Sequence, residues 1–227
     1  MDLFKSIDGE IFVFHTGMEP AQLDRHIKVE SMTSEEIRRL RLCNVDLTET
    51  FLPLNTFEEV LEHLKNKCIL NLDRSIKILD DVMKIVNKHN MADQVLLKSD
   101  PSDASLKMVE TFAPKVDYMP IFMEEDVASE KIENMNINYI GAELVFKSES
   151  SSIAQDSYID MMHKKGRILW GNSIVYSSRV PLAAGHNDDI SLTGDPEDGW
   201  GWLAKKGFDI IQTDWTHHCV NYLRNRY

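Results

Sequence analysis

The chain has 227 residues, of which 43% are hydrophobic, and it carries a formal net charge of −12. A chain of this length can bury one large core, and an acidic balance without a cluster of Lys and Arg argues against nucleic acid and anionic membrane surfaces as partners. No apolar run approaches the roughly 18–20 residues of a membrane-spanning helix, so no transmembrane segment is expected.

The N-terminal part of the chain predicts a strand and then a short helix. The apolar run EIFVF at 10–14 predicts a strand that ends at His15. After a polar segment, Ser31 or Ser34 can cap a short helix that carries Ile37.

The next helix has a clear start signal. In NTFEEVLEHLKNK, Thr56 and Glu59 stand at the spacing of a capping box, and the apolar residues that follow share one face. The apolar run CILNLD at 68–73 comes directly behind this helix. It therefore predicts a buried strand that follows a helix.

From that point on, helices and strands alternate. The predicted strands have short apolar cores and polar residues at their C-terminal ends, and they lie at 68–73, 94–98, 117–123, 139–146, 167–172 and 208–214. Helices are predicted between and after them, at 75–89, 104–112, 128–135, 154–164, 200–206 and around Val220. This alternation predicts a parallel sheet with helices outside it, and the lack of a dinucleotide fingerprint favours a (β/α)8 barrel over a doubly wound sheet.

In such a barrel, the functional residues lie at the C-terminal ends of the strands. The residues at those ends are Asp73, Lys98, Glu124 or Glu125, Phe146 or Lys147, Trp170 with Asn172, and Asp214 with Trp215. The longest irregular stretch, 176–199, predicts a loop over the mouth of the barrel. Its acidic part from Asp188 to Asp198 lacks the spacing of an EF-hand and predicts a solvated loop.

The first residues of the chain resemble a family signature. In MDLFKSIDGEIFVFHTG, Asp2, the turn Asp8-Gly9 and His15 are spaced as in the hairpin of glycerophosphodiester phosphodiesterases, which follows a strand ending in Glu-x-Asp. NTFEEVLEHLK, LNLD and GFDIIQTDW are similar to later landmarks of that family, in the same order. The resemblance covers essentially the whole chain and implies a TIM barrel.

The resemblance also implies a site. Members of the family hold a divalent metal with carboxylates and use two histidines as acid and base. Carried over position by position, the implied residues are the metal ligands Asp2 and Asp73, the catalytic residue His15, and the substrate-binding residues Lys98, Trp170 and Trp215. Carboxylate ligands suit Mg²⁺ or Ca²⁺.

The chain departs from the family pattern at several positions. The His-Arg-Gly strand end and the Glu of Glu-x-Asp have no counterpart, because Met1 falls on the x. Thr16 follows His15 where the family has Asp, and Asp73 stands where a glutamate is usual. The implied site therefore lacks half of the acid/base pair and one metal ligand.

We expect a single domain over residues 1–227, an α/β fold of the (β/α)8 TIM-barrel type. The predicted barrel is N-terminally incomplete, because the first strand–helix unit and most of the second strand are absent. A hairpin insertion region covers 2–30, and barrel strands three to eight lie within 68–227.

The resemblance implies a phosphoric diester hydrolase of lipid metabolism. The expected reaction is metal-dependent hydrolysis of a small-molecule glycerophosphodiester to an alcohol and glycerol 3-phosphate. His15 would act with a second histidine that is missing from this chain, so the activity of the chain as written is left open.

Alternatives stay open. The chain could be a catalytically inactive truncated barrel that binds a phosphate ligand or a protein, and the exposed edges of an open barrel predict homo-oligomers. It could also be a relative that cleaves phosphoinositides or sphingolipids. From the residues alone, His15 is compatible with a surface position, Asp73 with a helix N-cap and Lys98 with a solvated strand end.

The cysteines indicate the compartment. Cys43, Cys68 and Cys219 lie far apart and form no CxxC motif. Their odd number and wide spacing argue against a disulfide framework and favour a reducing compartment. We therefore expect a cytoplasmic protein.

Overall fold

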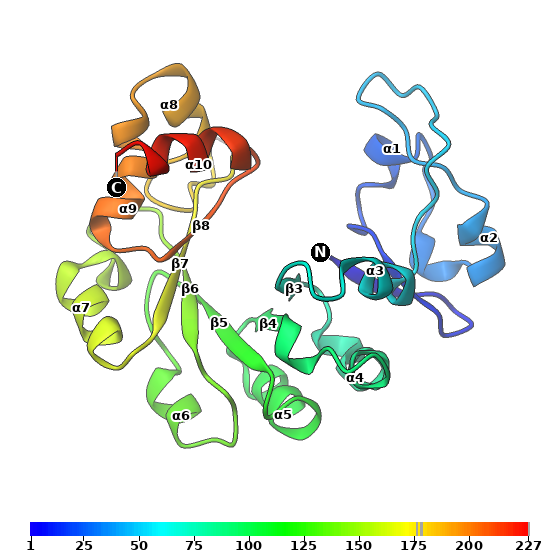
Figure 1. The fold of residues 1–227 in the computed structure, drawn as a ribbon, viewed down its shortest axis with the longest axis horizontal. Helices are drawn as coiled ribbons and strands as arrows, with labels where there is room; N and C mark the ends of the chain where they lie inside the picture. Colours follow the sequence, from blue (N-terminus) through cyan, green and yellow to red (C-terminus); the bar gives the residue numbers. More distant parts are fainter. Residues whose placement is uncertain (176, 178, 227) are drawn as a thin grey trace. The chain divides into compact units, whose positions relative to one another are not determined.

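The computed structural model describes residues 1–175, 177 and 179–226. The chain forms two compact units (Figure 1). Unit 1 consists of Met1–Asp117 with Asn136–Asn138, and unit 2 consists of Tyr118–Met135 with Tyr139–Tyr227.

Unit 1 contains an antiparallel hairpin and a pair of parallel strands. Its strands are β1 (Leu3–Lys5), β2 (Ile11–Val13), β3 (Leu70–Leu72) and β4 (Val95–Ser99). Its helices are α1 (Glu19–Gln22), α2 (Ser34–Arg38), α3 (Phe57–Leu64), α4 (Leu79–Lys88) and α5 (Asp103–Phe112), with the short 3-10 helices η1 (Val29–Ser31), η2 (Ile76–Ile78) and η3 (Ala92–Gln94). β1 pairs antiparallel with β2, and β3 pairs parallel with β4.

The hairpin has its own apolar core. Phe4, Phe12 and Phe14 are buried, and the rings of Phe4 and Phe12 stack with their centroids 5.7 Å apart. Val29 and Ile37 are fully buried in the same cluster. Aromatic residues carry large apolar areas, so this cluster fixes the strand that leads to His15.

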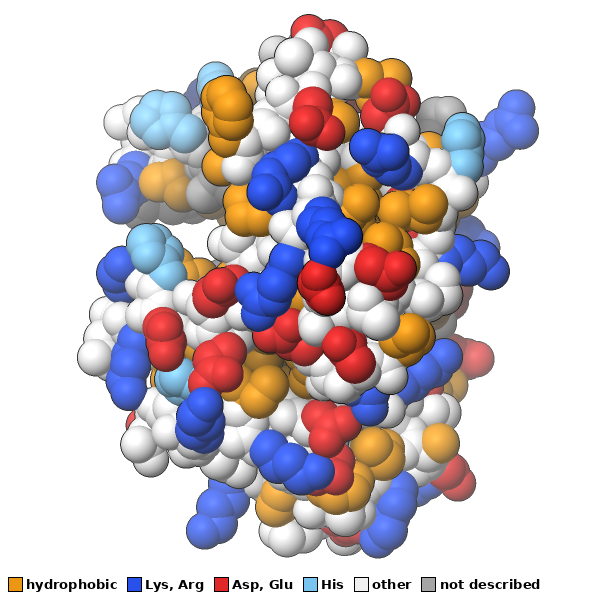
Figure 2. Space-filling view, turned by 90° about the vertical axis from the view of Figure 1, so that its right-hand side faces the viewer, with side chains coloured by type: hydrophobic (Ala, Val, Ile, Leu, Met, Phe, Trp, Pro, Cys, Tyr) orange, Lys and Arg blue, Asp and Glu red, His pale blue; other side chains and the backbone are white. Residues whose placement is uncertain are grey.

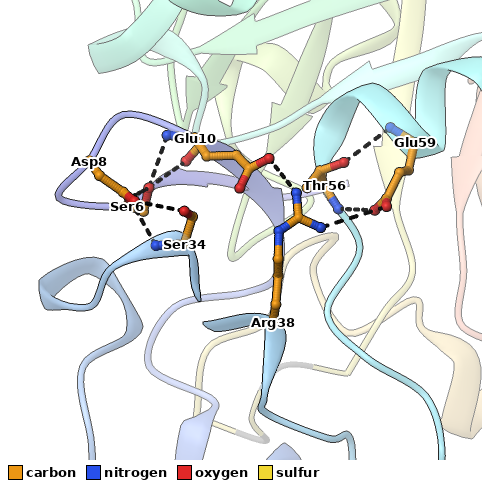
Figure 3. Close-up of polar contacts among 7 residues, drawn as sticks. All are labelled: Ser6, Asp8, Glu10, Ser34, Arg38, Thr56 and Glu59. Carbon is orange, nitrogen blue, oxygen red and sulfur yellow. Dashed lines mark hydrogen bonds and ion pairs between the residues drawn. The ribbon is translucent and has the colours of Figure 1, made fainter. Parts of the chain in front are cut away.

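Two capping boxes start helices in unit 1. The box of Thr56 and Glu59 at the start of α3 is confirmed: the Thr56 N–H donates to Glu59 Oε2 at 2.8 Å, and the Glu59 N–H donates to Thr56 Oγ1 at 3.2 Å (Figure 3). The prediction that Ser31 or Ser34 caps α2 was wrong, because Thr33 is the N-cap. Ser34 already lies in the first helical turn, where its Oγ donates to Asp8 at 2.6 Å.

Unit 2 is built on four strands that pair in parallel in chain order. They are β5 (Asp117–Met123), β6 (Gly141–Val145), β7 (Ile168–Asn172) and β8 (Ile210–Gln212). The helices are α6 (Ser129–Glu133), α7 (Asp156–Lys164), α8 (Asp188–Thr193), α9 (Trp200–Lys206) and α10 (Thr216–Arg224), with the 3-10 helices η4 (Ser152–Ala154) and η5 (Pro196–Asp198). Figure 1 shows α8, α9 and α10 gathered at the end of unit 2 where the C-terminus lies. The predicted alternation of helices and strands is confirmed.

The stretch 176–199, predicted as a loop, is partly helical. Residues 176 and 178 lie outside the described residues, but α8 and η5 both fall within this stretch and within its acidic part, predicted as solvated. Asp188 is 2% exposed, so the prediction that its surroundings are solvated was wrong. The physical reason is that hydrogen-bond donors from elsewhere in unit 2 surround its carboxylate.

Charged side chains of both signs lie together on the face of the molecule drawn in Figure 2, where Asp and Glu side chains interleave with Lys and Arg. Lys84, for example, pairs with Asp80 at 2.9 Å and with Asp81 at 3.1 Å. Within the described part of the chain, no helix is both long and apolar enough to cross a bilayer.

Candidate functional site

Asp2 and Asp73 lie side by side in unit 1. The two residues are bridge partners in parallel pairing: the Leu3 N–H donates to the Asp73 carbonyl at 3.1 Å, and the Asp73 N–H donates to the Met1 carbonyl at 2.8 Å. Side chains of directly paired residues project to the same face. The two predicted metal ligands are therefore neighbours, although they are 71 positions apart in sequence.

Lys98 lies beside Asp73. The register pairs Leu72 of β3 with Leu97 of β4, so the residues that follow each of them are adjacent. Lys98 Nζ is 4.0 Å from Asp73 Oδ2, and the Lys98 residue is 3% exposed. Such burial contradicts the solvated strand end that the residues alone allowed. A buried ammonium is stable beside a carboxylate because the pairing offsets its lost hydration.

The alternative role of Asp73 as a helix N-cap is also wrong. The N-cap position of η2 is held by Ser75, which is buried and whose Oγ donates to the Leu72 carbonyl at 2.9 Å. The Asp73 carboxylate instead faces Lys98 and the Asn71 amide, whose Nδ2 lies 3.4 Å from Asp73 Oδ2.

His15 follows β2 and is held close to Asp2 through the backbone, because the Phe14 N–H donates to the Asp2 carbonyl at 3.0 Å. Its Nε2 lies 3.0 Å from Arg74 Nη2. A guanidinium can only donate, so we infer that Nε2 accepts and that Nδ1 carries the proton. Nδ1 is buried and has no hydrogen-bond partner among the described residues. The Nε2 lone pair of His15 is therefore engaged by the Arg74 guanidinium.

Sequence reasoning missed Arg74. Its Nε lies 3.3 Å from Asp2 Oδ1, and its Nη1 donates to the Thr16 carbonyl at 3.3 Å and to Thr16 Oγ1 at 3.2 Å. With the contact to His15 Nε2, the guanidinium joins a predicted metal ligand to the predicted acid/base residue. The available signal was a basic residue directly after the third-strand landmark LNLD.

The oxygen atoms around Asp73 fit a divalent cation. Asn71 and Asp73 lie two residues apart on β3 and its end, so their side chains share a face with Asp2. Asn71 Oδ1 is buried and has no hydrogen-bond partner among the described residues. Two carboxylates and an unpartnered amide oxygen form a set of hard ligands, and Mg²⁺ and Ca²⁺ prefer oxygen. The residues present therefore fit the implied metal.

A second cluster in unit 1 also has metal-binding atoms. Glu58, Glu62 and His89 place ligand atoms within 4.8 Å of one another. The Lys88 ammonium and His89 Nε2 already bond to the same Glu58 oxygen. An ammonium at that oxygen repels a cation, so this cluster is a weaker candidate than Asp2 and Asp73.

Trp170 and Trp215 belong to unit 2. Trp170 Nε1 donates to Gln212 Oε1 at 3.1 Å across the β7–β8 pair, and the indole lines an apolar cavity of about 430 Å³. Trp215 is 47% exposed and meets His218 edge to face, with ring centroids 5.6 Å apart. Both indoles keep apolar surface available for a ligand.

Two buried acids in unit 2 also escaped the sequence analysis. Glu143 in β6 is 4% exposed and accepts from Asn172 Nδ2 at 3.1 Å. The sequence signal was an acid inside the apolar strand GAELV. Asp188 accepts hydrogen bonds from Ser173, Trp200 and Thr213, each at 2.7 Å.

Comparisons with known proteins address the fold. A domain family of unknown function matches residues 118–223, and no curated protein matches the chain. A glycerophosphoryl diester phosphodiesterase from Parabacteroides distasonis superposes with a TM-score of 0.76 at 18% identity, covering 99% of this chain and 74% of that one. The glycerophosphodiester phosphodiesterase of Thermotoga maritima gives 0.65 at 18% identity, covering 99% of this chain and 83% of that one.

A third structure is an Oleispira antarctica phosphodiesterase in complex with the product sn-glycerol-3-phosphate. It superposes with a TM-score of 0.66 at 14% identity and covers 98% of this chain and 83% of that one. The incompleteness of the barrel at its N-terminus stays a prediction. The predicted fold class is confirmed, because the chain has the α/β TIM-barrel fold of glycerophosphodiester phosphodiesterases.

Proposed function

We propose that the chain is a phosphoric diester hydrolase that cleaves glycerophosphodiesters to an alcohol and glycerol 3-phosphate with the help of a divalent cation. The observation that carries this proposal is the pairing of Asp2 with Asp73, with His15 and Lys98 beside them. It is supported by the similar fold of the Oleispira phosphodiesterase, whose structure contains sn-glycerol-3-phosphate.

Asp2 and Asp73 would hold the cation, with Asn71 Oδ1 as a neutral oxygen beside them. Bound there, a divalent cation supplies positive charge to the non-bridging oxygens of the phosphate. Lys98 adds a fixed positive charge next to Asp73 and cannot move far, because it is buried. Once a divalent cation offsets the charge of the two carboxylates, the Lys98 ammonium makes the site locally positive, within a chain of net charge −12.

His15 would exchange the proton. Its Nε2 carries a lone pair, so it can accept a proton from an attacking hydroxyl and return it to a leaving oxygen. One histidine can serve only one side of an in-line displacement at a time. The proposal therefore keeps the second histidine that the family resemblance implies.

Trp170 and Trp215 would contact the alcohol group. Indole rings present flat apolar surfaces that also attract cationic head groups. This assignment extends the proposal to unit 2, where Trp170 lines a cavity.

A panel of glycerophosphodiesters and bis(p-nitrophenyl) phosphate tests the proposal. We expect release of glycerol 3-phosphate in the presence of Mg²⁺ or Ca²⁺ and its loss on chelation with EDTA. No turnover of any substrate in the panel with either cation present would overturn the hydrolase proposal.

A silent phosphate-binding barrel is the second candidate. The observation that favours it is that Arg74 already pairs with Asp2, at 3.3 Å, and Lys98 with Asp73, at 4.0 Å. Two cations beside two carboxylates can bind an anion without turnover. Binding of glycerol 3-phosphate without hydrolysis of any diester would favour this candidate. The predicted homo-oligomer and cytoplasmic location stay predictions.

A further inference from the structure

The Arg74 guanidinium lies between Asp2 and His15, two residues of the proposed site. It touches Asp2 through Nε, Thr16 through Nη1 and His15 through Nη2. The Arg74 side chain is 46% exposed, so it is accessible from solvent. Lys98, by comparison, has a side chain that is 1% exposed. Of these two cations, Arg74 is the one that an incoming anion can reach from solvent.

The backbone at Arg74 is specialised for this placement. Its φ is +54°, in the left-handed region that non-glycine residues seldom adopt. Such a conformation is unfavourable for a residue with a side chain and persists where the surroundings enforce it. Here the next residue, Ser75, is 1% exposed and is bonded back to the Leu72 carbonyl. This tight turn directs Arg74 towards His15 and Thr16, which are 59 and 58 positions away in sequence.

The contacts of Arg74 leave room for a stronger partner. The contact with Asp2 involves a single pair of atoms, Arg74 Nε and Asp2 Oδ1, 3.3 Å apart. A guanidinium prefers two parallel hydrogen bonds to a carboxylate or phosphate. A phosphate that enters beside Asp2 and Asp73 can accept such a pair. The same movement would take Nη2 away from His15 Nε2 and free its lone pair.

We propose that Arg74 is a phosphate-binding residue of this site and that phosphate binding releases His15 from its hydrogen bond to the guanidinium. This inference rests on the proposed function for the class of substrate, a phosphodiester with a glycerol 3-phosphate product. It adds a residue that couples binding of the anion to the availability of the acid/base group.

Calorimetric titration with sn-glycerol 3-phosphate and with inorganic phosphate tests the binding role. Arg74→Asn removes the guanidinium but keeps a residue type that tolerates positive φ. Arg74→Lys keeps the positive charge but loses the pair of N–H donors that can bind one phosphate in two places. Arg39→Asn is the matched control, because Arg39 pairs on the surface with Glu35 and its side chain is 73% exposed. We expect binding at least about tenfold weaker for Arg74→Asn, an intermediate loss for Arg74→Lys and no change for Arg39→Asn.

A measurement on the unaltered protein tests the release of His15 independently of any folding defect. The ¹⁵N resonance of His15 Nε2, assigned with His15→Gln, should shift when phosphate saturates the site. A resonance that stays unchanged at saturation would overturn the release.

The outcomes separate this inference from the proposed function. Equal binding by the wild type and a folded Arg74→Asn would overturn the inference while leaving the hydrolase proposal standing. Arg74-dependent binding without hydrolysis of any diester would support the inference and overturn the hydrolase. A wild type that binds neither phosphate ligand would overturn both.

Discussion

Asp188 is a single side chain that ties three segments of unit 2 together. Its carboxylate accepts from Ser173 Oγ, Trp200 Nε1 and Thr213 Oγ1, each at 2.7 Å, and from the Asp214 N–H at 2.9 Å. These donors come from the end of β7, from α9 and from the segment after β8. Four hydrogen bonds compensate the carboxylate for its lost hydration. Asp188 therefore fixes the segment that carries Trp215.

Replacing Asp188 with Ala should destabilise the protein strongly. The change leaves the buried Nε1–H of Trp200 without its acceptor and removes a carboxylate that binds four donors, so we expect the free energy of unfolding to fall by about 3 kcal/mol or more. Urea unfolding followed by tryptophan fluorescence measures this loss. Asp189→Ala removes the same charge from the exposed neighbouring residue, and it should cost less than about 0.5 kcal/mol. Equal losses in the two variants would contradict the anchoring role.

The cysteines should differ in reactivity. Cys219 is 3% exposed, and burial raises the pKa of its thiol to about 11, whereas Cys68 is exposed. The thiolate is the reactive form, so iodoacetamide at about pH 8 should modify Cys68 well before Cys219. Mass spectrometry of tryptic peptides gives the two rates, and in urea they should converge. Similar rates in the native protein would show that Cys219 is accessible.

At the scale of elements, the turn between β1 and β2 is fixed by side-chain hydrogen bonds. Asp8 accepts from Ser6 Oγ at 2.6 Å and from the N–H and Oγ of Ser34 at 2.8 and 2.6 Å (Figure 3). Arg38 at the end of α2 pairs with Glu10 at the start of β2. Helix α2 is thereby joined at both ends to the hairpin whose second strand leads to His15.

Acid should weaken this junction through Asp8. The hydrogen bonds from the Ser34 and Ser6 side chains and from the Ser34 N–H lower the pKa of Asp8 from 3.8 to about 2. A group whose pKa is lower in the folded state stabilises that state fully above its ordinary pKa and loses the effect as the pH falls through the folded value. The contribution of Asp8 should therefore be complete above pH 3.8 and disappear as the pH falls through about 2.

Carboxyl ¹³C NMR measures the titration of Asp8 directly. In Asp8→Asn, stability should depend less on pH across the same interval, because the titrating group is gone. A carboxyl that titrates near its ordinary value in the folded protein would show that these hydrogen bonds do not form in solution.

At the scale of the whole molecule, each unit contains its own set of the proposed functional residues. Unit 1 contains the residues that would handle the phosphate: Asp2, His15, Asp73, Arg74 and Lys98. Unit 2 contains the aromatic residues that would meet the alcohol, Trp170 and Trp215.

Two substitutions in unit 1 should have different consequences. His15→Gln removes the acid/base group, so we expect kcat to fall by roughly 10²–10⁴-fold while phosphate binding persists. Asp73→Asn removes a cation ligand, so we expect weaker binding of Mg²⁺ as well as loss of turnover. Steady-state kinetics and calorimetry of Mg²⁺ binding separate the two effects. Loss of Mg²⁺ binding in His15→Gln alone would contradict the assigned ligands.

The sequence predicted those features that depend on neighbouring residues. The capping box of Thr56 and Glu59 spans four residues, and its partners meet wherever the helix forms. The strand DYMPIFM has the bounds of β5, because its apolar pattern is continuous. The N-cap of α2 shows the limit of such signals: Ser31, Thr33 and Ser34 are all suitable types, and the backbone at Thr33 decided among them.

The order of elements, the fold class and the proximity of Asp2 to His15 were determined by the sequence, through periodicity and family-like spacing. The tertiary structure decided that Lys98 is buried beside Asp73, that Arg74 joins Asp2 to His15 and that Asp188 is enclosed by donors. Each of these depends on partners at least 12 positions away, which meet only when strand register and turns are fixed. Burial and pairing are properties of those long-range contacts, and they have no local pattern in the chain.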